Sequence, residues 1–189
     1  YPLERLDTLS ALARQKGLKS HVDGARVMNA VVASGIPLAR RVAGFDTLSF
    51  CFSKGLGAPV GSVLCGSTQD MKRGRRIRKL MGGGMRQSGM LAAAAQYALN
   101  HHVDRLADDH RRALTLAHGA LELGLELTLP ETNIVYINVA DSATFVQGLS
   151  DHGISCLAVS PTRVRLVVHL GINDAAVDAT LNGMRAVVS

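Results

Sequence analysis

Apolar residues recur along the first part of the chain with two spacings, one typical of helices and one typical of strands. Leucines three residues apart over residues 3–12 predict a helix, and Gly17 is a typical residue to end it. The expected helices cover residues 3–13, 27–34 and 37–42, and the expected strands cover residues 18–22, 46–52 and 60–65. This short alternation predicts an α/β sheet covered by helices on both faces.

From Gln69 onward the pattern is helical for a long way, and it then changes to a small α+β module. The glycine run at 82–84 interrupts the helical part. The further helices are expected over residues 90–102, 105–123, 142–150 and 174–188, and the further strands over 133–139, 154–159 and 163–169. We therefore expect two domains, residues 1–103 as part of a large domain and residues 104–189 as a small carboxyl-terminal domain.

The composition is that of a globular protein, with 47% hydrophobic and 19% charged residues among 189. No apolar stretch approaches the roughly 20 residues of a membrane span, and the first residues do not follow a signal-peptide pattern. The three cysteines, Cys51, Cys65 and Cys156, lack CxxC spacing and are typical of a reducing compartment. A cytoplasmic protein without a membrane partner is expected.

The net charge of +6 comes from one segment, KRGRRIRK at 72–79, which holds six basic residues and no acidic one. Outside it, 15 basic residues face 15 acidic ones. Nucleic-acid binding, a phosphate or subunit contact, and a solvated helix face are all compatible with such a segment. The absence of Trp and the 4% aromatic content argue against a surface that stacks bases.

Two of the expected strands end in residues that carry chemistry, one in Asp23 with Arg26 beyond it and the next in Ser53-Lys54. Open α/β sheets bind ligands at the carboxyl ends of their strands. A carboxylate, a guanidinium and an amine at one edge suit pyridoxal phosphate, since the amine can bond its aldehyde and the carboxylate can keep its ring nitrogen protonated. Spacing alone leaves open a simple Asp-Gly turn, a local ion pair and a solvent-facing lysine.

Three longer segments make the pattern specific: HVDGARVMNA at 21–30, SFCFSKGLGAPVGS at 49–62 and GGGMRQSG at 82–89. Because these three segments occur in this order, the chain resembles the low-specificity L-threonine aldolases over nearly its whole length. These are fold-type I pyridoxal-phosphate enzymes. The resemblance implies aldol cleavage of L-threonine or L-allo-threonine to glycine and acetaldehyde. It also implies an amino-acid substrate, a homotetramer in the full-length form, and a role in threonine catabolism and glycine formation.

The resemblance also implies roles for particular residues. Lys54 would bind the cofactor covalently, and Asp23 would pair with its ring nitrogen. Arg26 would lie beside the ring hydroxyl, Arg86 would approach the cofactor phosphate of a neighbouring subunit, and Arg165 would bind the substrate carboxylate. Arg163 and His169, near Arg165 in the sequence, have weaker claims.

His21 and Asp23 could be half of a metal site, but no third ligand is evident in the sequence, so no metal is expected. In this family the basic segment lies near subunit contacts, which makes nucleic acid the less favoured partner.

The chain also departs from the family pattern. Val168 and Gly171 stand where the family usually has a hydroxyl and an acidic residue. A YPLE-like sequence lies well inside family members, so we expect that about half of the enzyme is missing here, including the phosphate-binding backbone and a histidine that stacks on the ring. Two alternatives follow, an inactive remnant of an aldolase and a related lyase that eliminates at Cβ.

Overall fold

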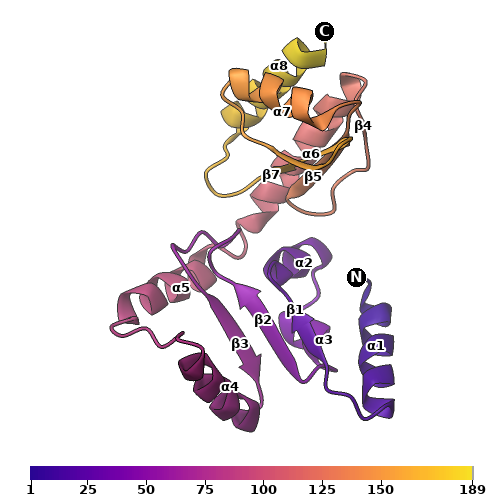
Figure 1. The fold of residues 1–189 in the computed structure, drawn as a ribbon. Helices are drawn as coiled ribbons and strands as arrows, with labels where there is room; N and C mark the ends of the chain where they lie inside the picture. The colour runs from indigo at the N-terminus through magenta and orange to yellow at the C-terminus, as the bar shows by residue number, and fades with distance from the viewer. Residues whose placement is uncertain (189) are drawn as a thin grey trace. The chain divides into compact units, whose positions relative to one another are not determined.

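The computed structural model describes residues 1–188, which form two compact units, Tyr1–Asp104 and a second one from Arg105 (Figure 1). The boundary between the units lies in the short segment that separates two helices. That the units correspond to two independent domains stays a prediction. No helix in the described part of the chain combines the length and the apolar character needed to cross a bilayer.

The first unit is built around a three-stranded sheet of β1 (His21–Asp23), β2 (Thr47–Cys51) and β3 (Ser62–Gly66), in that order. β1 runs parallel to β2, and β3 runs antiparallel to it, as the arrows in Figure 1 show. The helices of this unit are α1 (Leu3–Gln15), α2 (Val27–Ser34), α3 (Leu38–Val42), α4 (Thr68–Leu80) and α5 (Gly89–His101).

The two faces of this sheet differ sharply in burial. Leu48 and Phe50 of β2 are buried with Val27 of α2, and side chains of α3 and α5 complete this core. The opposite face carries exposed polar side chains, among them His21 and Asp23, and α4 packs against its β3 side. The expected helical cover is therefore complete on one face only, because on the other face most of the alternating positions of β1 and β2 are polar.

Asp46 joins the segments that lead into β1 and β2. Its carboxylate accepts hydrogen bonds from Lys19 Nζ at 2.7 Å and from the backbone N–H of Ser20 at 2.8 Å. These bonds, the one from Lys19 first, lower the pKa of Asp46 to about 2. They also correct the expected strand over 18–22: β1 begins only at His21, because the N–H of Ser20 is bound to a side chain instead of a neighbouring strand.

The second unit is a four-stranded antiparallel sheet with helices on one face (Figure 1). The strand order is β4-β5-β7-β6. The strands are β4 (Glu126–Leu127), β5 (Ile134–Asn138), β6 (Leu157–Ser160) and β7 (Arg163–Val167), and the helices are α6 (Leu106–Glu122), α7 (Ser142–Asp151) and α8 (Asp174–Val188). Its core includes Ile137, Leu149 and Met184, all without exposed surface. β4 was not expected from the sequence, since a two-residue strand leaves no periodic pattern.

The Asp46 contacts predict a defined loss of stability in acid. A carboxyl group whose pKa is lowered by folding stabilises the native state above its unfolded pKa of about 4, and this contribution disappears as the pH falls from about 4 to 2. Denaturant unfolding at pH 6 and pH 3 measures it. In Lys19→Met the drop in stability between the two pH values is smaller than in the unaltered chain. Lys16→Met, which removes a nearby exposed lysine, keeps the full drop, and equal drops in both variants contradict the assignment.

Candidate active site

Backbone hydrogen bonds hold the turn after β1 against the end of β2, and these bonds fix the position of Asp23. The N–H of Gly24 donates to the carbonyl of Ser49 at 2.8 Å, and the N–H of Cys51 donates to the carbonyl of Ala25 at 3.4 Å. A Cβ on residue 24 would lie 2.7 Å from Leu48 Cδ1 and 2.9 Å from the Ser49 carbonyl oxygen. Only glycine permits this approach. Asp23 is thereby held beside the end of the neighbouring parallel strand.

The Asp23 carboxylate is exposed at the end of β1. Its Oδ1 accepts a hydrogen bond of 3.2 Å from the N–H of Ala25, so the simple turn considered from the sequence is present. The turn and a ligand-binding role are compatible, because the turn orients the carboxylate and leaves it open to solvent.

Lys54 lies in the loop of residues 52–61, here called the lysine loop, which follows β2 and is closed by backbone hydrogen bonds. The N–H groups of Phe52 and Ser53 both point to the carbonyl of Gly61, at 2.9 and 3.3 Å. Within the loop, Gly57 donates to the carbonyl of Lys54 at 2.9 Å and has a φ of +72°, which favours glycine. The side chain of Lys54 is exposed, on a backbone whose path is fixed on both sides.

His102, at the end of α5, anchors the lysine loop. Its Nδ1 lies 2.6 Å from the carbonyl oxygen of Leu56, and because a carbonyl only accepts, this nitrogen carries the proton. Leu56 itself is 3% exposed. The sequence does not predict this contact, because the two residues are 46 positions apart and the only local signal is the pair of histidines at the end of a helical stretch.

Arg26 reaches the same edge of the sheet from the turn after β1. It lines a narrow cleft together with Cys51 and with Gly55 and Leu56 of the lysine loop. Its Nε is buried, and among the described residues no hydrogen-bond acceptor faces it. The structure thus brings Asp23, Arg26 and the lysine loop to adjacent strand ends, as expected for an open sheet. Their chemical roles stay predictions.

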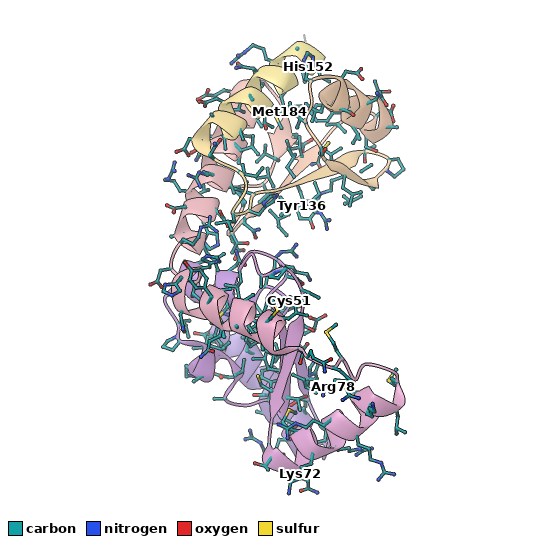
Figure 2. All side chains as sticks on the ribbon, turned by 90° about the vertical axis from the view of Figure 1, so that its left-hand side faces the viewer. Cys51, Lys72, Arg78, Tyr136, His152 and Met184 are labelled. Carbon is teal, nitrogen blue, oxygen red and sulfur yellow. The ribbon has the colours of Figure 1, made fainter. Side chains whose placement is uncertain are left out.

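Arg86 is exposed in the connection between α4 and α5, beside Gln87, whose φ of +49° is unusual for a residue other than glycine. Among the described residues, no hydrogen bond or ion pair links Arg86 to Asp23 or Lys54. The six basic residues of 72–79 all lie on α4 and are exposed; Figure 2 labels Lys72 and Arg78 among them. An open groove of about 630 Å³ runs between this helix and β3.

Arg165 belongs to the second unit. It lies on β7 directly opposite Tyr136 of β5, on the face of the sheet that the helices leave open, and its Nε is buried without an acceptor among the described residues. Arg163 stacks on Tyr136, with Cζ 4.4 Å from the ring centroid. His169 is exposed, and its Nδ1 accepts a hydrogen bond from the N–H of Gly171 at 3.1 Å.

No group of three His, Cys, Asp or Glu side chains in the described residues is placed to hold a metal ion. His21 instead uses both of its ring nitrogens in hydrogen bonds to hydroxyl groups of β2.

The comparison with protein families decides the membership of the chain, since the model described as "Beta-eliminating lyase" matches residues 1–142. The chain belongs to the beta-eliminating lyase family. It is 42% identical over 189 residues to "Probable low-specificity L-threonine aldolase 2" of Arabidopsis thaliana, covering 96% of this chain and 53% of that protein. It is 41% identical over 172 residues to the low specificity L-threonine aldolase of Escherichia coli K12, covering 91% and 52%. The chain spans about half the length of the curated relatives it matches.

The structure of a threonine aldolase from Leishmania major has the same fold over all of this chain and 57% of its own length, with a TM-score of 0.85 at 19% identity. The resemblance seen in the sequence and the expected fold class are both confirmed. Within this member of the beta-eliminating lyase family, the first unit and part of the second fall inside the matched range.

The anchor of the lysine loop is testable through stability. His102→Ala removes the hydrogen bond and leaves the Leu56 carbonyl without its partner, which costs about 1–3 kcal/mol. The matched variant is His101→Ala, because both histidines contact the ring of Tyr97 but only His102 binds the loop. Denaturant unfolding is expected to show a loss for His102→Ala about 1 kcal/mol larger than for His101→Ala. Equal losses show that the anchor contributes nothing.

Proposed function

We propose that this chain forms the lysine-bearing part of a pyridoxal-phosphate-dependent lyase that cleaves L-threonine or L-allo-threonine to glycine and acetaldehyde. The observation that supports it most is that Asp23 and Lys54 follow adjacent parallel strands, and that backbone hydrogen bonds join the turn after Asp23 to the end of β2. The named relatives at 41–42% identity support the choice of substrate.

The residues at this edge fit the proposed cofactor. Lys54 offers an exposed primary amine for an aldehyde, and Asp23 offers a carboxylate for a protonated ring nitrogen. The buried Nε of Arg26 lacks an acceptor, which is costly unless a ligand or water supplies one. An oxygen substituent of the ring is a suitable acceptor for it.

When bound, the cofactor supplies an electron sink for the pair of electrons released as the Cα–Cβ bond breaks. Asp23 favours that chemistry because its negative charge keeps the proton on the ring nitrogen. Lys54 would hold the cofactor aldehyde through its Nζ, and the same amine, when it is not bonded to the cofactor, would carry a proton. The guanidinium of Arg165 binds the substrate carboxylate, and Arg86 contributes positive charge toward a phosphate.

The family description favours a second candidate, elimination at Cβ. The two reactions are separated by their products, since aldol cleavage gives glycine and an aldehyde, whereas elimination gives ammonia and a keto acid. The chain spans about half the length of the named relatives.

Assembly and cellular role belong to the same proposal. The full-length form is a homotetramer in the cytoplasm that serves threonine catabolism and glycine formation, and nucleic acid and membranes are not its partners. Exposed apolar side chains around Arg86 support a subunit contact: Leu80, Met81, Met85 and Met90.

Covalent trapping tests the proposed function directly. Borohydride reduction of the chain with pyridoxal phosphate is expected to leave a pyridoxyl group on Lys54, found by peptide mass spectrometry. Lys54→Ala loses the label, and Lys16→Ala, at an exposed helix-end lysine, keeps it. Labelling spread over many lysines, or none at Lys54, contradicts the proposal.

Asp23→Asn tests the counter-charge at the ring nitrogen. The amide keeps the size of the side chain but removes the charge, so we expect the affinity for pyridoxal phosphate to fall at least about tenfold. Absorbance titration at the wavelength of the bound cofactor measures this, with Asp151→Asn in the second unit as the control. An unchanged dissociation constant for Asp23→Asn refutes the role of this carboxylate.

A further inference from the structure

The open face of the second sheet carries two arginines in neighbouring positions. Arg163 and Arg165 are two residues apart on β7, so both side chains emerge on the face opposite the core, with Cα atoms about 7 Å apart. On β5, Asn138 is paired with Arg163, and Tyr136 is paired with Arg165. The two pairs therefore form adjacent rows across the same face.

The side chain of Arg163 does not stay over the residue that is paired with it. Its Cζ lies 4.4 Å from the ring centroid of Tyr136, although the residue opposite Arg163 on β5 is Asn138. The guanidinium is thus displaced along the strand toward the row of Arg165. Stacking holds it there, because the face of an aromatic ring attracts a cation. Figure 2 labels Tyr136 on this sheet.

The two guanidinium groups have no counter-charge of their own. Within residues 1–188, neither arginine side chain makes an ion pair or a hydrogen bond, and the Nε of Arg165 is buried without an acceptor. The acidic residue of the four strands, Glu126, is opposite Asn138 and so lies two strands away from Arg163. Two cations that approach each other raise the free energy unless an anion neutralises them.

The neighbours of Arg165 across the sheet leave one direction for a second charged contact. Tyr136 is opposite it on β5, and Leu157, which is exposed, is opposite it on β6. The second cation is reached along the strand, at Arg163. A ligand with one carboxylate can pair with one guanidinium in the two-pronged geometry, whereas a ligand with two carboxylates can pair with both.

We propose that Arg163, held on the Tyr136 ring, forms a second anion subsite beside Arg165, and that the pair takes an amino acid with a carboxylate in its side chain. The inference rests on the proposed function for the placement of the α-carboxylate at Arg165. It extends the ligand range beyond L-threonine: replacing the methyl group of threonine by a carboxylate gives 3-hydroxyaspartate, which keeps the β-hydroxyl group.

Succinate and acetate test the subsite without cofactor. The Nε–H signal of Arg165 in the ¹⁵N-labelled chain is followed by NMR during titration with each anion at constant ionic strength. Since a second charge-assisted pair forms only with succinate, we expect succinate to bind at least about tenfold more tightly than acetate. Arg163→Gln reduces this preference to about twofold, the statistical advantage of two carboxylates, and leaves the affinity for acetate unchanged.

The matched control is Arg185→Gln, which removes an exposed positive charge from α8 of the same unit and keeps the full preference for succinate. Circular dichroism checks that both variants are folded. A preference for succinate of twofold or less in the unaltered chain overturns the proposal. A preference that survives Arg163→Gln, or that Arg185→Gln lowers equally, also overturns it, because general attraction by a positive chain then explains the result.

The ligand class is tested by the same titration with 3-hydroxyaspartate and L-threonine. We expect 3-hydroxyaspartate to bind about tenfold more tightly, and this difference to disappear in Arg163→Gln. Equal binding of the two amino acids overturns the assignment of the ligand class. If borohydride fails to label Lys54 while both preferences depend on Arg163, the proposed function fails and the anion subsite stands. If Lys54 is labelled and neither preference is seen, the subsite fails and the proposed function stands.

Discussion

The parallel pairing of β1 with β2 is the constraint on which the candidate site depends. Parallel strands present their carboxyl ends at one edge of a sheet, so the turn carrying Asp23 and the loop carrying Lys54 start from the same edge. The bond between the Gly24 N–H and the Ser49 carbonyl then fixes the turn against β2 at a distance that excludes a side chain. Without this pairing the carboxylate and the amine would not lie at one edge of the sheet.

The reactive groups are exposed, while the residues that position them are held by packing and hydrogen bonds. Lys54 and Asp23 reach solvent, but Leu56 is buried in the lysine loop and its carbonyl is bound by His102. This division suits a site that must admit a ligand and yet keep its geometry, because a fixed backbone lowers the entropy lost when the ligand binds.

Two arginines carry a buried Nε that lacks an acceptor in the described residues, Arg26 in the first unit and Arg165 in the second. A buried donor without a partner costs about 1–3 kcal/mol, so folded chains rarely keep one without a reason. The resemblance in sequence implies that both residues bind anionic or oxygen-bearing groups. The cost is offset if a cofactor and a substrate supply the missing acceptors, which makes these two atoms structural support for the proposed function.

The amino-acid sequence by itself determined the long helices, the polar residues at two consecutive strand ends and the motifs that indicated the family, because these depend on local periodicity and on residue order. Only the tertiary structure decided that β1 begins at His21, that Ser49 lies opposite Asp23, and that His102 binds the lysine loop. These features arise from contacts between residues more than 20 positions apart, and no local pattern encodes the register in which such segments meet.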